Sequence, residues 1–342
     1  MKISTGVNYA GDVVKAADTV AELERAGIDT VWIAEAYSFD AVSLMGYLAA
    51  KTSTVNIGSG ILNIYSRTPS CLGQTAAGLD AVSGGRAILG LGASGPQVIE
   101  GFHGVAYDRP LARTREIIEI CRMMWKREPV KHEGIYNLPL PEGQGTGLGK
   151  ALKLINHPVR SHIPIYVAAI GEKNVTMTAE VADGWLPIFF MPERASDVWG
   201  AALRAGTAKR DPSLAPLDVV AGGLFAIGDG LEGVRDFMRP ALALYIGGMG
   251  ARGKNFYNEL ACRYGFERQA KEIQDLYLDG KKQEAAAAVP AEMLESMTLV
   301  GSEGYVKEKI SAFREAGVTN LQVTAVGAEP ITDLQKLKAW AD

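Results

Sequence analysis

The feature of this sequence that most constrains its fold is a regular alternation of short β-branched runs with amphipathic helical stretches. This pattern is typical of parallel strands joined by helical crossovers. Such units build either an open doubly wound sheet or a closed barrel, and the number of strands decides between them. About eight runs have strand character, over residues 3–8, 29–34, 55–62, 87–91, 163–169, 184–188, 217–227 and 321–326. We therefore predict an α/β fold of the (β/α)₈ TIM-barrel class.

Helical stretches separate these runs, and glycines end several of them. Gly27 and Gly317 each follow a helical pattern at the position where a C-terminal cap is expected. The expected helices cover residues 12–26, 40–51, 69–82, 109–126, 173–182, 194–210 and 304–317.

Two segments interrupt the alternation. Residues 128–161 are rich in glycine and proline, which predicts an ordered loop or a short hairpin, and residues 231–297 are mostly helical in pattern. In barrels such insertions normally extend the βα loops that grip substrates. We predict one TIM-barrel domain over residues 1–342, with the second insertion covering the barrel mouth or forming a dimer contact.

Composition excludes several classes of function. The net charge is −4 and neither sign forms a long block, which argues against a nucleic-acid partner. No leader, cleavage site or long apolar run occurs, so we expect a soluble cytoplasmic protein without a membrane span.

Three dispersed cysteines are expected as buried, reduced thiols, and no G-x-S-x-G elbow supports a hydrolase. The histidines form no compact ligand set, so no metal is expected and a structural or exposed role is predicted for His103, His132, His157 and His162.

Glycines interrupt the strand pattern at residues 55–62. Glycines inside a strand mark a bulge or a close approach by another backbone or a ligand, and composition alone favours a tight barrel corner. The order of residues is more informative. Gly58-Ser59-Gly60-Ile61, followed by an Asn-x-Tyr-x-Arg-x-Pro run from Asn63, resembles the bacterial luciferase-like superfamily. Within it, the chain is similar to methylene-tetrahydromethanopterin reductases and deazaflavin-dependent oxidoreductases. The similarity continues through residues 74–80 and 83–86 and covers residues 1 to about 190 well.

The resemblance implies a cofactor, a reaction and an assembly. It implies coenzyme F420 and hydride transfer between this deazaflavin and a small organic substrate, by a homodimer. It also implies a non-prolyl cis peptide between Gly60 and Ile61 that presses on one face of the ring. An FMN-dependent monooxygenase using reduced flavin and dioxygen remains an alternative, and so does a non-catalytic barrel that only binds a cofactor.

Glu35 ends the second strand, at the barrel face where active sites assemble. An acidic residue is usual at this position in the family, and Glu35 would contact the ring, or else be a salt-bridged residue at the mouth. Several deazaflavin enzymes carry a histidine directly after this acid as a proton donor, but this chain has Ala36. The departure argues against the sugar-phosphate and alcohol dehydrogenase branches. We predict Glu35 and Tyr65 as catalytic residues, with the proton donor unassigned.

Small residues after later strands complete the predicted site. Gly92 and Ala93 would let the backbone approach the cofactor, without the spacing or position of a dinucleotide fingerprint. Residues 169–174 feed a strand into a helix whose first amides suit a phosphate, with Gly184 near the cofactor tail. The expected cofactor contacts are Glu35, Ser59, Gly60, Ile61, Asn63, Gly92, Ala93, Ala168, Ala169, Ile170, Gly171, Glu172, Lys173, Asn174, Gly184 and Trp185. Surface charge, or contact with an acidic group, is expected for Arg109, Arg113, Arg252, Lys254, Tyr257 and Asn258.

Overall fold

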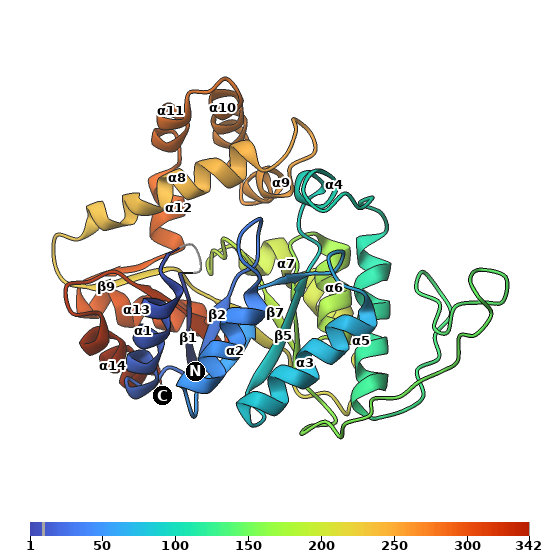
Figure 1. The fold of residues 1–342 in the computed structure, drawn as a ribbon. Helices are drawn as coiled ribbons and strands as arrows, with labels where there is room; N and C mark the ends of the chain where they lie inside the picture. Colours follow the sequence, from blue (N-terminus) through green and yellow to red (C-terminus); the bar gives the residue numbers. More distant parts are fainter. Residues whose placement is uncertain (9–10, 342) are drawn as a thin grey trace.

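A closed parallel barrel forms the centre of the protein (Figure 1). The computed structural model describes residues 1–8 and 11–341. In this part of the chain the main sheet has nine strands, and β3 pairs with both β2 and β5, which closes the barrel. β4 continues the path of β3, so eight strand positions surround the axis. The strands are β1 (Lys2–Gly6), β2 (Thr30–Ile33), β3 (Asn56–Ser59), β4 (Leu62–Asn63), β5 (Ala87–Gly92), β6 (Ile165–Ala168), β7 (Gly184–Leu186), β8 (Asp218–Ala221) and β11 (Asn320–Gln322). The predicted fold class is confirmed.

Helices cover the outside of the barrel in the order that the sequence predicts (Figure 1). Asp12, Asp40 and Thr68 cap the first three through side-chain bonds to first-turn amides, and Gly84 ends the third in a left-handed conformation. These helices are α1 (Val13–Arg25), α2 (Ala41–Lys51), α3 (Pro69–Ser83), α5 (Pro110–Trp125), α6 (Glu172–Val181), α7 (Ala195–Thr207), α13 (Glu303–Glu315) and α14 (Pro330–Ala341). The sequence patterns missed α14 and the short helix α4 (Pro96–Gly101).

The predicted strand over residues 217–227 is two strands. At Gly222 and Gly223 the chain leaves the barrel for a small parallel sheet of β10 (Leu299–Gly301), β9 (Leu224–Ile227) and β12 (Thr324–Ala325). A Cβ at Gly222 would lie 2.1 Å from the Gln322 carbonyl oxygen, and one at Gly223 would lie 2.0 Å from the Met297 carbonyl oxygen. Glycine therefore allows the close backbone approach that redirects the chain here.

The two insertions differ in structure. The first has no helix or strand in its described residues beyond an isolated bridge between His132 and Leu138, and it projects away from the barrel in Figure 1. It lies between α5 and β6, so it is an αβ loop at the end of the barrel where the strands begin, and the prediction that it extends a βα loop is wrong. The second is helical, as predicted, and its helices gather at one end of the barrel together with α4, which directly follows β5 (Figure 1). This is the end where the strands finish, so the second insertion stands over the barrel mouth. It contains η1 (Glu232–Met238), α8 (Arg239–Ala243), η2 (Leu244–Gly248), α9 (Phe256–Arg263), α10 (Glu267–Leu278), α11 (Lys282–Ala287) and α12 (Ala291–Ser296).

Aromatic side chains fill the barrel interior. The rings of Trp32 and Tyr166 lie 5.3 Å apart and pack with Ile88 and Val220. Glycines on neighbouring strands make room for them: a Cβ at Gly58 would lie 2.4 Å from the Trp32 ring, and one at Gly184 would lie 2.3 Å from the Tyr166 ring.

Among the described helices, none is long and apolar enough to cross a membrane.

Candidate active site

The bulge between β3 and β4 is tied to β5 through Ser59. The Ser59 hydroxyl accepts a hydrogen bond from the Gly90 amide at 2.8 Å and donates one to the Gly90 carbonyl at 2.9 Å. A Cβ at Gly90 would lie 1.8 Å from the Ser59 carbonyl oxygen, so only glycine fits beside it. Ser59 is fully buried and its proton is used within the barrel, which gives this side chain a structural role. The Gly60–Ile61 peptide is cis, as the resemblance implies.

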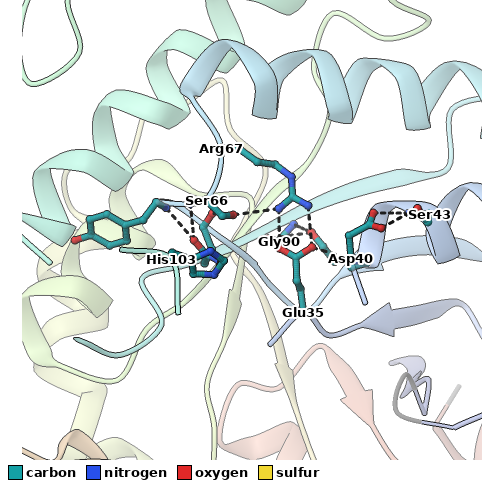
Figure 2. Close-up of polar contacts among 11 residues, drawn as sticks. Glu35, Asp40, Ser43, Ser66, Arg67, Gly90 and His103 are labelled. Carbon is teal, nitrogen blue, oxygen red and sulfur yellow. Dashed lines mark hydrogen bonds and ion pairs between the residues drawn. The ribbon is translucent and has the colours of Figure 1, made fainter. Parts of the chain in front are cut away.

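Asn63 organises the turn that follows. Its Oδ1 accepts hydrogen bonds from the amides of Tyr65, at 3.0 Å, and Ser66, at 2.7 Å. Its Nδ2 lies 3.2 Å from Nε2 of His103, which comes from the loop after α4 (Figure 2). The sequence predicts no site role for His103, because this contact joins residues 40 positions apart and no local spacing indicates it.

Glu35 is held by Arg67 at the end of β2. The guanidinium donates to the carboxylate through Nη1–Oε1 at 2.6 Å and Nη2–Oε2 at 2.8 Å, and the Ala41 amide also donates to Oε2 at 3.0 Å (Figure 2). The side chains of Glu35 and Arg67 are only 8% and 16% exposed. Hydrogen bonding to Glu35 raises the pKa of Arg67. Both carboxylate oxygens are engaged, so Glu35 forms a fixed ion pair at the mouth.

Tyr65 anchors the loop that precedes α5. Its hydroxyl donates to the Asp108 carbonyl oxygen at 2.9 Å, and its ring lies 5.3 Å from that of Tyr107. The Arg113 guanidinium lies 5.4 Å from the Tyr65 ring centroid. Burial raises the pKa of the Tyr65 hydroxyl. The hydroxyl proton is thus bonded within the protein, and Tyr65 fixes the position of the loop.

Two tryptophans hold the loop between β6 and α6. The indole nitrogen of Trp185 donates to the Ala169 carbonyl at 2.9 Å, and that of Trp199 donates to the Ile170 carbonyl at 3.0 Å. Both tryptophans are fully buried and their rings pack edge to face at 5.2 Å. Trp185 therefore supports the loop from behind.

The first turn of α6 is open to a ligand. Gly171 is the N-cap and provides no side-chain cap, and a Cβ built on it would meet nothing within 4 Å. The Asn174 Oδ1 atom is buried without a hydrogen-bond partner in the described part of the chain. Amides of Glu172 and Lys173, together with the helix dipole, suit an anion at this position. Residues 169–174 thus keep the features of the predicted phosphate site.

Of the remaining predicted contacts, Gly92 and Ala93 lie beside the bulge and Gly184 lies in the barrel interior. A Cβ at Gly92 would lie 2.8 Å from the Ile61 side chain and 3.5 Å from the Ala168 Cβ, so these three residues meet beside the bulge. Ala93 directly follows Gly92 at the end of β5. Gly184 faces the barrel interior, where the Tyr166 ring explains the need for glycine.

Aromatic residues from the second insertion meet the β7 loop. Phe189 has a φ of 52°, and its ring contacts those of Tyr245, at 5.2 Å, and Tyr257, at 6.1 Å. The Tyr264 hydroxyl donates to the Phe189 carbonyl at 2.9 Å and so holds this backbone. Burial raises the pKa of Tyr257. Tyr257, a candidate polar contact on its sequence, therefore makes an aromatic contact in the structure.

The charged residues considered as substrate contacts are mostly paired within the protein. Arg113 and Arg109 bind Asp108 at 2.6 and 3.1 Å, and Arg252 binds Asp275 at 3.0 Å. Among the described residues, no group of three or more histidine, cysteine, aspartate or glutamate side chains could hold a metal ion. The cysteines are free; Cys121 is buried and Cys262 half-buried, but Cys71 is exposed on α3, so the prediction of three buried thiols is wrong there.

Comparisons with known proteins extend these observations. A model of the family described as luciferase-like monooxygenase matches residues 1–320. The chain is 42% identical to a Mycobacterium tuberculosis protein assigned by name to the coenzyme F420-dependent oxidoreductases, over 94% of this chain and 93% of the other. It is 28% identical to a 5,10-methylenetetrahydromethanopterin reductase of Archaeoglobus fulgidus, over 87% of this chain and 85% of that protein. The solved coenzyme F420-dependent tetrahydromethanopterin reductase of Methanopyrus kandleri superposes with a TM-score of 0.80 at 23% identity, covering 98% of this chain and 96% of that one.

Proposed function

Because the chain belongs to the luciferase-like monooxygenase family, we propose that it is a coenzyme F420-dependent oxidoreductase that moves hydride between the deazaflavin and an organic substrate. The observation that carries the proposal is the 42% identity, over nearly the whole length of both chains, to a protein named for this activity. The F420-dependent reductase that shares the fold agrees with it.

The described residues fit such a cofactor at two places. The uncapped start of α6, with Gly171 leaving its amides accessible, would bind the cofactor phosphate. The Gly60–Ile61 bulge, backed by Gly92, would lie against the ring. Both places follow the carboxyl ends of barrel strands, where TIM-barrel active sites form. The deazaflavin supplies the hydride chemistry when bound, and the protein supplies binding, orientation and exclusion of water.

Glu35 and Tyr65 would act in this site by positioning. The Glu35–Arg67 ion pair fixes the end of β2 against the start of α3, and Tyr65 fixes the loop before α5. Ala36, beside Glu35, offers no proton donor. The Glu35–Arg67 pair carries no net charge of its own, so neither side chain is a free counter-ion for a substrate. The proposal includes a homodimer located in the cytoplasm, and sedimentation of the purified protein tests the dimer.

Fluorescence titration with F420 and FMN in parallel tests the cofactor. We expect quenching of F420 at low concentration and weaker binding of FMN. Tight FMN binding with none for F420 would replace the proposal by the FMN-dependent monooxygenase. A protein that binds F420, but whose reduced cofactor no compound in a broad acceptor panel reoxidises, would instead be a non-catalytic carrier. The exposed Lys150→Ala variant, in the projecting first insertion, serves as a control that leaves binding unchanged.

A further inference from the structure

The hydrogen bonds of Asn63 determine where the proton of His103 lies. Asn63 is 3% exposed, and its Oδ1 accepts two backbone amides, so the side-chain amide has only one acceptable orientation. Its Nδ2, a donor, therefore faces Nε2 of His103 at 3.2 Å. Two donors cannot share a hydrogen bond, so Nε2 is the acceptor and the imidazole is neutral with its proton on Nδ1.

The Nδ1–H group of His103 is available to a ligand. Within the described part of the chain this group has no hydrogen-bond partner. It is not among the buried polar atoms that lack a partner, so it is accessible to solvent. The side chain as a whole is half-buried. An oriented donor with a free proton is ready to bind an acceptor atom.

His103 stands at the mouth, beside the proposed ring site. Its partner Asn63 pairs with Gly92 across the ends of β4 and β5 and follows the Gly60–Ile61 bulge directly in the chain. Asn63 links His103 to Ser66, whose hydroxyl in turn accepts a hydrogen bond from Arg67 at 3.3 Å (Figure 2). The ring of His103 also contacts Phe102 at 5.2 Å.

The surface around His103 is apolar. Phe102 and Tyr37 are 62% and 68% exposed, and their rings lie 6.4 Å apart. Exposed aromatic side chains at a site opening indicate an apolar ligand. Together with an uncharged hydrogen-bond donor, this rim suits an uncharged organic molecule that presents one polar acceptor.

We propose that Asn63 holds His103 as a neutral Nδ1–H donor, and that His103 hydrogen-bonds to the carbonyl oxygen of an uncharged ketone or conjugated enone substrate. In reduction, hydride from the reduced deazaflavin forms the new C–H bond and the electron pair of the broken π bond moves onto oxygen, whose developing charge is stabilised by Nδ1–H. A proton from water completes the product, so His103 itself is not deprotonated. The proposal rests on the proposed function, because it takes F420 as the hydride source.

The tautomer is tested without any substrate. Long-range ¹H–¹⁵N spectra of protein labelled in its histidine rings report which nitrogen carries the proton. We expect Nδ1–H for His103 in the wild type and Nε2–H in Asn63→Asp, where a carboxylate oxygen replaces the donor. His157, exposed in the first insertion, should give the same spectrum in both proteins. Nε2–H in the wild type, or no change in Asn63→Asp, would overturn the role of Asn63.

The substrate contact is tested by reoxidation of reduced F420 with 2-cyclohexen-1-one as the probe. Loss of one preorganised donor lowers the rate by about 10²-fold, and we expect this in His103→Leu. His103→Asn, whose Nδ2 lies close to the position of Nδ1, should recover part of the rate, and His157→Asn should match the wild type. F420 affinity, measured by quenching, should stay within about twofold of the wild-type value in all three of these variants, because His103 is proposed to contact the substrate and not the cofactor.

These measurements separate the two proposals. A wild type that fails to bind F420 refutes the proposed function. A wild type that binds F420, but reduces the enone no faster than His103→Leu, or not at all, refutes the role of His103 in carbonyl reduction.

Discussion

Replacing Gly184 by alanine distinguishes a packing glycine from a cofactor contact. The new Cβ would lie 2.3 Å from the Tyr166 ring, which is 5% exposed and confined by Trp32 at 5.3 Å. The ring cannot swing away freely, because its hydroxyl donates to Asp218 at 2.6 Å. Overpacking costs about 1–3 kcal/mol, and disturbing a hydrogen bond to a charged group adds about 1.5–3 kcal/mol. The expected loss of unfolding free energy is therefore about 2.5–6 kcal/mol.

Thermal unfolding measures this loss. The entropy of unfolding of a chain of this length is about 0.7 kcal/mol per degree, so Gly184→Ala should lower Tm by about 4–9 °C. Gly78→Ala in α3 is the matched control, because its Cβ would meet nothing within 4 Å, and it should be neutral or slightly stabilising. If Gly184→Ala is as stable as this control, the packing explanation is wrong. If it keeps its stability and loses F420 affinity, Gly184 contacts the cofactor as the resemblance implies.

Two further predictions concern carboxylates with several partners. Glu35→Gln should lower the unfolding free energy by about 2–4 kcal/mol, because it leaves the half-buried Arg67 without its counter-ion. Urea denaturation measures the loss, and the double variant Glu35→Gln/Arg67→Met should recover part of it. A Glu35→Gln variant as stable as the wild type would contradict the reasoning. Partial burial of Glu24 opposes ionisation, but backbone hydrogen bonds lower its pKa to about 2, through amides of Thr54, Val55 and Ser53. Since the folded pKa is below the unfolded value of 4.5, the stabilisation is present above pH 4.5 and is lost as the pH falls towards 2. It amounts to about 1–2 kcal/mol after allowance for solvent screening, and Glu24→Gln should remove this part of the acid sensitivity in urea titrations between pH 5 and about 2.5.

The sequence predicts the barrel well because periodicity and capping are local signals. Asp12, Asp40 and Thr68 accept hydrogen bonds from amides only two or three residues away, so a helix start is visible in a short window. The prediction of one strand over residues 217–227 was wrong, because the chain forms two strands there. The division depends on close backbone contacts with Gln322 and Met297. No pattern within the strand reveals such distant neighbours.

The site was predictable in position and only partly in role. The run from Gly58 to Tyr65 identified the bulge, but sequence could not show that the Ser59 hydroxyl is used by Gly90 or that Arg67 engages both oxygens of Glu35. Those roles depend on partners about thirty residues away. His103 was missed for the same physical reason: the signal is the orientation of one amide, fixed by two backbone donors.

The glycines of the predicted site show how one residue type serves opposite purposes, and this distinction gives the last prediction. Gly92 and Gly184 are each closed in by neighbouring atoms, whereas Gly171 has open space where a Cβ would lie. Its φ of −70° is allowed for any residue, so Gly171→Ala should fold with an unchanged Tm. A methyl group in that space would nevertheless obstruct an anion approaching the first amides of α6. We expect F420 affinity to fall by about tenfold or more, equivalent to about 1.4 kcal/mol, while Gly78→Ala binds like the wild type. Equal affinity in Gly171→Ala would show that the phosphate binds elsewhere, and the start of α6 would then be an ordinary turn.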